Sequence, residues 1–147
     1  MRNLLIVCNP GRVDAVVAAV ELQQNLASTF GIYTISDVNI PGMIRSTIAD
    51  LPEIEVAVVL GGDGTILRAI TYIRDLNIPI LGINTGRLGF LANIQKDSIE
   101  KSIDLLIAKK YKIQERTLLS IKVIQTKYIT DHYGSAMHLG IWTMQVG

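Results

Sequence analysis

The stretch VAVVLGGDGT, residues 56–65, decides how this chain folds. Residues 56–60 form a short, largely β-branched run that is typical of a buried strand. Three glycines around one carboxylate follow, and a segment with helical spacing, residues 65–74, begins directly after them. A strand that ends in glycines at a helix N-terminus presents backbone N–H groups that can hold phosphate. This junction therefore predicts an α/β fold with a phosphate site at the end of a strand.

Strands and helices alternate over residues 1–110. Hydrophobic runs predict strands over residues 3–8, 32–35, 55–60 and 78–83, and alternation predicts a half-exposed strand over residues 117–124. Because strand–helix alternation is typical of doubly wound sheets, we predict a mostly parallel, Rossmann-like sheet with helices on both faces. The segments that follow its strands, residues 8–11, 61–65 and 84–89, should then share one edge.

Several details of this plan depend on single residues. Gly31 is the expected C-terminal cap of the first helix, and Asp97 with Glu100 resembles a capping box that would start the last one. Residues 39–52 should form a loop with a helical turn near residues 44–49. In the first helix, an apolar stripe recurs at helical spacing, formed by Val13, Val16, Val17 and Val20 and extended by Leu26 and Ala27.

The composition fits a soluble cytoplasmic protein. The chain has 147 residues, 49% of them hydrophobic and 18% charged, which suits one globular domain with a real core. A net charge of +1 predicts neither a nucleic-acid partner nor a membrane surface, and we expect no signal peptide or membrane span. Cys8 is the only cysteine and ends a strand, so we expect a buried thiol and no metal cluster.

A second motif, NTGRLGFL at residues 84–91, follows the strand predicted over residues 78–83. Its two glycines allow a tight loop, Arg87 is a natural cation for phosphate, and Phe90 could give an adenine ring an aromatic wall. A purely structural interpretation is a loop that tucks Phe90 and Leu91 into the core. Asp63 argues for function, because a carboxylate beside a phosphate repels it unless it binds a metal or accepts a proton.

The two motifs in this order closely resemble the NAD kinase family. The matching segments are GGDGT at residues 61–65, IPILGINTGRLGFLA at residues 78–92 and ERTLL at residues 115–119. The resemblance covers residues 1–125 and implies the family's N-terminal α/β domain. It also implies phosphoryl transfer from ATP, or polyphosphate, to the 2′-hydroxyl of the adenosine ribose of NAD, which gives NADP.

The resemblance assigns roles to individual residues. Asp63 matches the catalytic aspartate, which would accept the proton of that hydroxyl. Leu67 and Phe90 match positions that line the adenine pocket, and Arg68 matches a position that can contact ligand, although a solvated basic residue would look the same. The remaining expected contacts with the nucleotides are Gly62, Asp63, Gly64, Thr65, Asn84 and Arg87. Mg²⁺ or another divalent cation would enter with the nucleotide, with no separate protein site for it.

The chain also departs from the family. Relatives continue into a β-rich domain that carries an Asn-Glu or Asn-Asp pair, and no asparagine of this chain is followed by an acidic residue. We therefore expect a nucleotide-binding domain over residues 1–116 and the start of a truncated β-rich domain, with an atypical tail, over residues 117–147. On its own the chain should have little or no kinase activity, and the strand at residues 117–124, left as an edge, should promote self-association. The resemblance implies homo-oligomers for a full-length member.

Two other functions stay open at this stage. Lipid kinases and phosphofructokinases carry turns similar to GGDGT, so the chain could phosphorylate a lipid or a sugar phosphate, although residues 84–90 argue against it. A non-catalytic or decayed nucleotide-binding fragment is the alternative from another class, and the missing acidic pair favours it for the isolated chain.

Overall fold

The computed structural model describes residues 1–147 except residues 88, 90, 93, 122–141 and 147. It contains two compact units, Met1–Lys112 and Ile113–Gly147. Within the described residues, no helix is both long enough and apolar enough to cross a bilayer.

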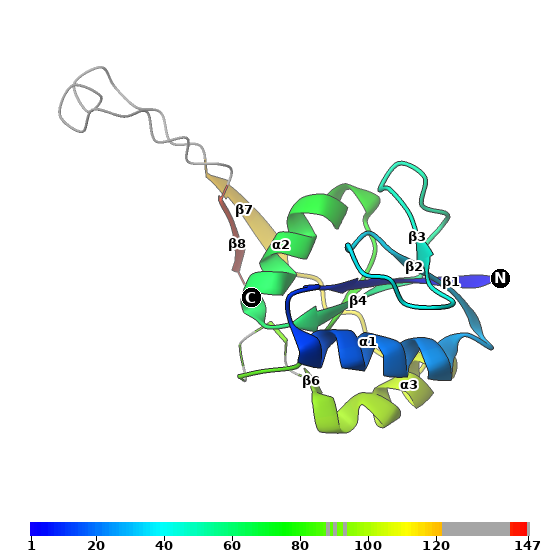
Figure 1. Cartoon of the computed structure of the whole chain (residues 1–147). Helices are drawn as coiled ribbons and strands as arrows, with labels where there is room; N and C mark the ends of the chain where they lie inside the picture. The colour runs from blue at the N-terminus through cyan, green and yellow to red at the C-terminus, as the bar shows by residue number, and fades with distance from the viewer. Residues whose placement is uncertain (88, 90, 93, 122–141, 147) are drawn as a thin grey trace, which may run out of the picture. The chain divides into compact units, whose positions relative to one another are not determined.

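A six-stranded parallel sheet forms the centre of the first unit (Figure 1). Its strand order is β3-β2-β1-β4-β5-β6. The strands are β1 (Arg2–Cys8), β2 (Phe30–Thr34), β3 (Ile44–Arg45), β4 (Val56–Gly61), β5 (Ile80–Asn84) and β6 (Ile94–Gln95). The parallel α/β sheet predicted from the sequence is confirmed.

Helices cover both faces of this sheet. Helices α1 (Val13–Leu26) and α3 (Ile99–Ile107) lie on one face, and α2 (Asp63–Ile73) lies on the other (Figure 1). Short 3₁₀ helices, η1 (Arg74–Leu76) and η2 (Lys96–Ser98), extend α2 and precede α3. The strands alternate accordingly: Ile6 and Val58 pack toward α1, whereas Leu5 and Val59 pack toward α2. The doubly wound arrangement is thus confirmed.

The chain reverses its winding direction at β1. It first moves from β1 to β2 on one side and then returns to place β4 on the other side. Sheets of this kind bind ligands in the crevice beyond the carboxyl ends of the strands at such a switch point. The GGDGT segment follows β4 and therefore starts at this crevice.

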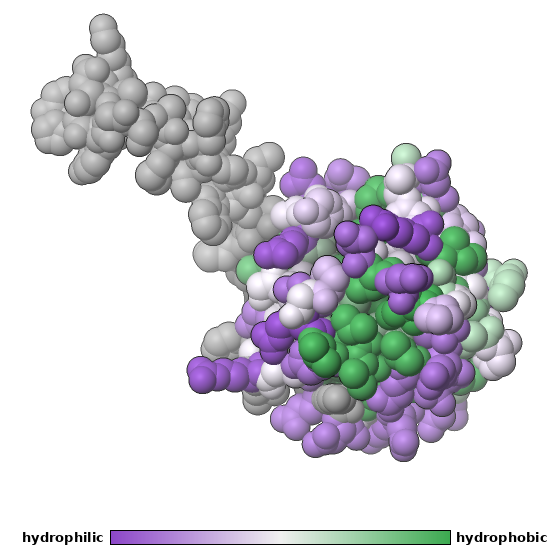
Figure 2. Space-filling view, viewed as in Figure 1, coloured by the Kyte–Doolittle hydropathy of each residue, from purple (hydrophilic) through white to green (hydrophobic). Residues whose placement is uncertain are grey.

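Helix α1 buries only part of the predicted stripe: Leu26 is fully buried and Val20 packs against the core, but the first valines do not. Val13 is 78% exposed and Val17 is 50% exposed, and Figure 2 shows hydrophobic surface over this helix. Alanines allow the helix backbone to approach the sheet closely, which larger valines would prevent. The buried residues of the helix are Ala15, Ala18, Ala19, Leu22 and Leu26.

Gly31 is not a helix cap, so that prediction is wrong. Helix α1 ends at Leu26 with Ala27 as its C-cap, and a turn in which the Thr29 N–H donates to the Leu26 carbonyl leads into β2. Gly31 lies inside β2, opposite Asn3 of β1. A Cβ there would come within 2.6 Å of Asn3 Oδ1, so the Asn3 side chain would have to move to admit one.

Two further local predictions are corrected. Residues 39–52 form the predicted loop except for residues 44–45, which form the short strand β3 and pair with β2; a turn in this segment lies at residues 47–50, where the Asp50 N–H donates to the Thr47 carbonyl at 3.2 Å. Helix α3 has Ser98 as its N-cap without a side-chain capping bond, so Asp97 and Glu100 do not form a capping box. Pairing with β2 makes residues 44–45 a strand, and the 3₁₀ helix η2 occupies the position where the capping box would start α3.

The second unit contains an antiparallel pair, β7 (Thr117–Ile121) and β8 (Trp142–Val146). Thr117 pairs with Val146 and Ile121 pairs with Trp142. The predicted strand over residues 117–124 is confirmed up to Ile121, and its last residues lie outside the described part. The tail, which has no clear period in the sequence, thus supplies a partner strand on one side of β7.

Candidate functional site

The two glycine-rich motifs meet at one edge of the sheet. Strands β4 and β5 are neighbours, and Gly61 at the end of β4 pairs with Asn84 at the end of β5. The Thr85 N–H donates to the Gly61 carbonyl at 3.2 Å, so pairing continues into the loop. Cys8, at the end of β1, is opposite Leu60. The three loops therefore share one edge, as the sequence predicts.

The glycines of the GGDGT segment have different tasks. Gly61 has a φ of 155°, and a Cβ there would lie 2.4 Å from Thr65 Oγ1, so only glycine lets the helix start this close to the strand. A Cβ at Gly62 or Gly64 would meet no atom within 4 Å. Gly62 is also the N-cap of α2 and makes no side-chain capping bond. The first turn of α2 thus presents bare backbone beside open space, which suits an anionic ligand.

The carboxylate of Asp63 is held against the second loop. Its Oδ1 accepts the N–H of Leu91 at 2.9 Å and that of Ala92 at 3.3 Å. Gly89 is in close contact with the same group, since a Cβ there would lie 2.3 Å from Oδ1. The half-buried side chain stands at the first residue of α2, so the helix and the loop together determine its position.

Asn84 shapes the loop from inside. Its side chain is 4% exposed, donates from Nδ2 to the Arg87 carbonyl and accepts the Gly86 N–H at 2.8 Å. These bonds fold residues 84–87 into a tight turn. Within the described residues, the Asn84 amide is therefore engaged with its own loop, and its predicted contact with a nucleotide remains a prediction.

The other predicted contacts lie around this loop and helix. Arg87 is exposed on the loop, and Leu67 is 40% exposed on α2. Phe90 lies outside the described residues. Arg12 belongs to the neighbouring β1–α1 loop and was not predicted: its Nη2 lies 3.4 Å from where a Cβ of Gly86 would be, and it pairs with Asp14 at 3.1 Å.

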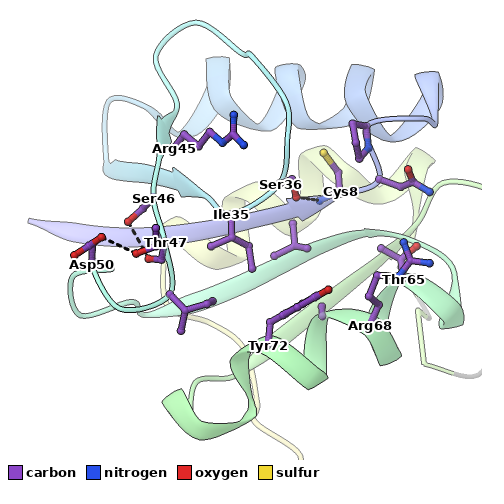
Figure 3. Close-up of a pocket in the computed structure, with 15 residues that line it drawn as sticks. Cys8, Ile35, Ser36, Arg45, Ser46, Thr47, Asp50, Thr65, Arg68 and Tyr72 are labelled. Carbon is purple, nitrogen blue, oxygen red and sulfur yellow. Dashed lines mark hydrogen bonds between the residues drawn. The ribbon is translucent and has the colours of Figure 1, made fainter. Parts of the chain in front are cut away.

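A cavity of about 700 Å³ opens on the other side of the first turn of α2 (Figure 3). Thr65 and Arg68 line it from α2, as two of the predicted site residues. Tyr72 and Ser36 also line it and were not predicted. Tyr72 could have been found, because it lies on the same helical face as Thr65 and Arg68. The walls are completed by the β1 loop and by residues 45–50: Asn9, Pro10, Arg45, Ser46, Thr47, Ile48 and Asp50.

Cys8 and Ser36 form a buried part of this cavity wall. The Ser36 hydroxyl accepts the Cys8 N–H at 3.0 Å, and the Ser36 N–H donates to the Thr34 hydroxyl at 3.0 Å. Cys8 is 4% exposed, and burial raises the pKa of its thiol. The prediction of a buried thiol is confirmed, and the bonds tie the ends of β1 and β2 together.

The described residues contain no group of three or more His, Cys, Asp and Glu side chains that could hold a metal ion.

Comparison with known proteins gives this arrangement its context. Residues 4–111 match the family model described as the ATP-NAD kinase N-terminal domain. The chain belongs to the NAD kinase family. The matched region includes both motifs, Asp63 and every residue that lines the cavity.

Individual relatives agree with this assignment. An NAD kinase of Flavobacterium psychrophilum is 57% identical over 68 residues, 46% of this chain and 23% of that protein. An NAD kinase of Leifsonia xyli subsp. xyli is 35% identical over 137 residues, 83% of this chain and 44% of that protein. The chain thus spans less than half the length of these relatives.

A solved structure shares the fold. The crystal structure of yeast NADH kinase complexed with NADH superimposes with a TM-score of 0.66 at 24% identity. The match covers 82% of this chain and 42% of the yeast chain. Like the sequence relatives, this NAD kinase-like structure extends well beyond the part that this chain matches.

Proposed function

We propose that this chain carries the part of an NAD kinase site that positions the 2′-hydroxyl of the adenosine ribose for phosphorylation. The observation that supports this most directly is the position of Asp63. Its carboxylate is held by the N–H groups of Leu91 and Ala92, at the N-terminus of a helix and beside the Asn84 loop. In phosphoryl transfer, the position of the group that accepts the proton matters more than its basicity. These two hydrogen bonds would keep the carboxylate in one position.

In the proposed reaction, Asp63 accepts the proton of the 2′-hydroxyl of NAD. At the same time the oxygen of that hydroxyl attacks the terminal phosphorus of the donor. A new P–O bond forms to NAD, the bond from that phosphorus to the bridging oxygen breaks, and the shortened donor leaves with the bond's electrons. Negative charge develops on the transferred group, and the bare first turn of α2 at Gly62 and Gly64 offers N–H groups to it.

The surrounding side chains have supporting roles in this proposal. Leu67 and Phe90 would line the adenine of NAD, and Arg87 and Arg68 would face phosphate. Asn84 would act mainly by shaping the loop that carries these groups, given its bonds to Arg87 and Gly86. A divalent cation would enter bound to the donor phosphates, because Mg²⁺ in kinase sites is held largely by substrate phosphates.

We also propose that the chain alone turns over slowly or not at all. It spans 44% of the Leifsonia relative, and no asparagine in it precedes an acidic residue. Phosphoryl transfer depends on positioning of both substrates, so contacts from outside these residues would raise the rate. Binding is therefore a more direct test than turnover for this polypeptide.

The test is an NMR titration of the ¹⁵N-labelled full chain with NAD. We expect chemical shift changes centred on residues 61–65 and 84–92, and a clear loss of affinity when Asp63→Asn and Gly89→Ala are combined. The matched control is Asp104→Asn, an exposed carboxylate on α3. Shifts that avoid both motifs, or no binding at millimolar NAD, would contradict the proposal.

The competing kinase hypotheses have no specific observation in their favour. An acceptor screen with labelled ATP, using a lipid, a sugar phosphate and NAD, separates them. Label appearing in lipid or sugar phosphate but not in NAD would replace the proposed acceptor.

A further inference from the structure

We propose that Gly82, inside β5, is a positioning residue for Asp63, because it lets the backbone of Leu91 and Ala92 come close enough to hold the carboxylate. This inference rests on the proposed function and deepens it, since it names a residue that determines how the proton acceptor is oriented. Gly82 belongs to neither glycine-rich motif: it follows the first and precedes the second.

Gly82 is a buried glycine in the middle of a strand. It is the third of the five residues of β5, and it pairs with Val59 of β4. Glycine weakens the interior of a strand, because it loses more conformational freedom on folding than other residues and offers no side chain to pack. A glycine in such a place commonly marks the close approach of another backbone.

The space that a side chain would occupy at Gly82 is filled from two directions. A Cβ there would lie 3.2 Å from Ala92 Cα, 3.3 Å from the Leu91 carbonyl oxygen and 2.5 Å from Ile66 Cδ1. Ala92 and Ile66 are buried in the same core cluster, on the face of the sheet that α2 covers (Figure 1). Both α2 and the segment after the Asn84 loop therefore rest on Gly82.

These two contacts set the distance between Asp63 and its hydrogen-bond donors. Ile66 is the first buried residue of α2, one turn after Asp63, so it anchors the turn that carries the carboxylate. Leu91 and Ala92 donate their N–H groups to Asp63 Oδ1 at 2.9 and 3.3 Å. Because the acceptor's helix and the donors pack on the same glycine, a side chain at Gly82 must move one relative to the other.

The hydrogen bond from Ala92 is the more sensitive of the two. Contacts as short as those of a Cβ at Gly82 with residues 91–92 require that backbone to shift by a few tenths of an ångström. The Ala92 bond is already 3.3 Å long, and good N–H···O bonds extend to about 3.2 Å. After such a shift the carboxylate is held less firmly, and a reacting group that is misplaced loses the advantage of orientation.

The test measures these hydrogen bonds directly in the full ¹⁵N,¹³C-labelled chain. NMR scalar couplings across a hydrogen bond, from the amide nitrogen of Leu91 or Ala92 to Asp63 Cγ, report each bond separately. Gly82→Ala alone also presses on Ile66 and so overpacks the core. Adding Ile66→Val removes the Cδ1 atom, so that only the contacts with the loop backbone are left.

The decisive comparison is the double variant, Gly82→Ala with Ile66→Val, against Ile66→Val alone. We expect the double variant to unfold cooperatively in urea, to lose the couplings to Asp63 and to bind NAD about fivefold more weakly than Ile66→Val. Ile66→Val alone should keep the couplings. A residue that only fills the core would change the unfolding midpoint and leave the couplings intact.

Gly31→Ala is the matched control. It also adds a methyl group inside a strand of the same sheet, where the Cβ would lie 2.6 Å from Asn3 Oδ1. Because this contact is at the opposite end of the sheet from Asp63, the couplings to the carboxylate should be unchanged.

Four results would overturn the inference: no coupling to Asp63 in the wild-type chain, unchanged couplings in the double variant, lost couplings with unchanged NAD affinity, or a double variant that no longer folds, which would make Gly82 a residue of the core alone. The NAD titration separates these from a failure of the proposed function. If NAD shifts residues 61–65 and 84–92 while the couplings survive the double variant, only the role of Gly82 is wrong. If the couplings are lost as expected but NAD misses both motifs in the wild type, Gly82 still positions Asp63 and the proposed acceptor is wrong.

Discussion

At the scale of single residues, the glycines of the GGDGT segment separate folding from binding. Gly61 is confined by its φ of 155° and by Thr65, whereas Gly64 faces open space within α2. A side chain at Gly61 would disturb the start of the helix, and a side chain at Gly64 would only occupy the space where a ligand is proposed to bind. The two positions therefore respond to the same substitution in different ways.

We predict that Gly64→Ala leaves the chain as stable as the wild type or stabilises it by up to about 1 kcal/mol, because alanine is the better helix former. It should nevertheless weaken NAD and nucleotide binding, since the methyl group occupies the bare surface of the first turn. Gly61→Ala should instead destabilise by about 1–3 kcal/mol. Urea unfolding and the NMR titration check both. Destabilisation by Gly64→Ala would contradict the prediction, because it would mean that the added methyl group meets other protein atoms in solution.

At the scale of elements, a cluster at the opposite edge of the sheet ties three segments together. Arg2, in β1, pairs with Glu55 through two bonds of 2.6 and 2.7 Å and donates to the carbonyls of Leu106 and Ile107 at the end of α3. Its guanidinium lies 4.3 Å from the ring centre of Phe30. The Tyr111 hydroxyl donates to Glu55 at 3.0 Å. These contacts link β1 to the start of β4 and to the end of α3, at the end of the sheet away from the glycine-rich loops.

This cluster gives stability a defined pH dependence. The hydrogen bond from Arg2, with smaller help from Tyr111, lowers the pKa of Glu55 below its usual value of 4.5. The contribution of Glu55 to folding stability is therefore complete above about pH 4.5. It is lost as the pH falls through the lower pKa that Glu55 has in the folded state. We predict that Glu55→Gln costs about 1–3 kcal/mol at pH 7 and flattens this acid limb. Urea unfolding between pH 3 and 7 measures it, with the exposed Asp75→Asn as control; a parallel acid limb in Glu55→Gln would contradict it.

Tyr111 gives the same cluster a basic limb. Burial first, and then the bond to Glu55, raises the pKa of Tyr111 above 10.0. The neutral phenol is the favoured form in the folded state. Stability from this group is therefore complete below pH 10 and is lost as the pH rises through the higher pKa of the folded chain.

Helix α1 provides a test of which of its faces packs on the sheet. Ala18 is fully buried and Val17 is 50% exposed, although the valines look more apolar in the sequence. We predict that Ala18→Val destabilises by about 1–3 kcal/mol through overpacking, whereas Val17→Ala changes stability by less than about 0.5 kcal/mol. Thermal and urea unfolding of the two variants measure the difference. A larger loss in Val17→Ala would restore the valine face as the buried one.

At the scale of the whole molecule, the sequence predicted those parts of the fold that are encoded by strong local patterns. The buried run at residues 56–60 and the glycines after it required a strand, a turn and a helix in that order, and alternation placed the motifs at one edge. The face of α1 was not predictable from hydrophobicity, because close packing favours alanine over valine there. The cavity was missed because residues 45–50, which form part of its wall, carry no strong local pattern: Arg45 ends the two-residue strand β3, and Asp50 lies in the loop after it.

The last prediction asks whether residues from the rest of a longer relative raise the activity of this chain. The chain spans 44% of the Leifsonia NAD kinase, to which it is 35% identical. We predict that joining residues 1–116 of this chain to the remainder of that relative raises NADP formation at least about a hundredfold over the chain alone, because the acceptor is then positioned from both sides. A coupled assay with an NADP-dependent dehydrogenase measures it. The same chimera with Asp63→Asn is the control and should lose most of the gain. An active chimera that is indifferent to Asp63→Asn would remove the aspartate from the reaction, and equal rates for the chain and the chimera would show that residues 1–147 already contain a complete site.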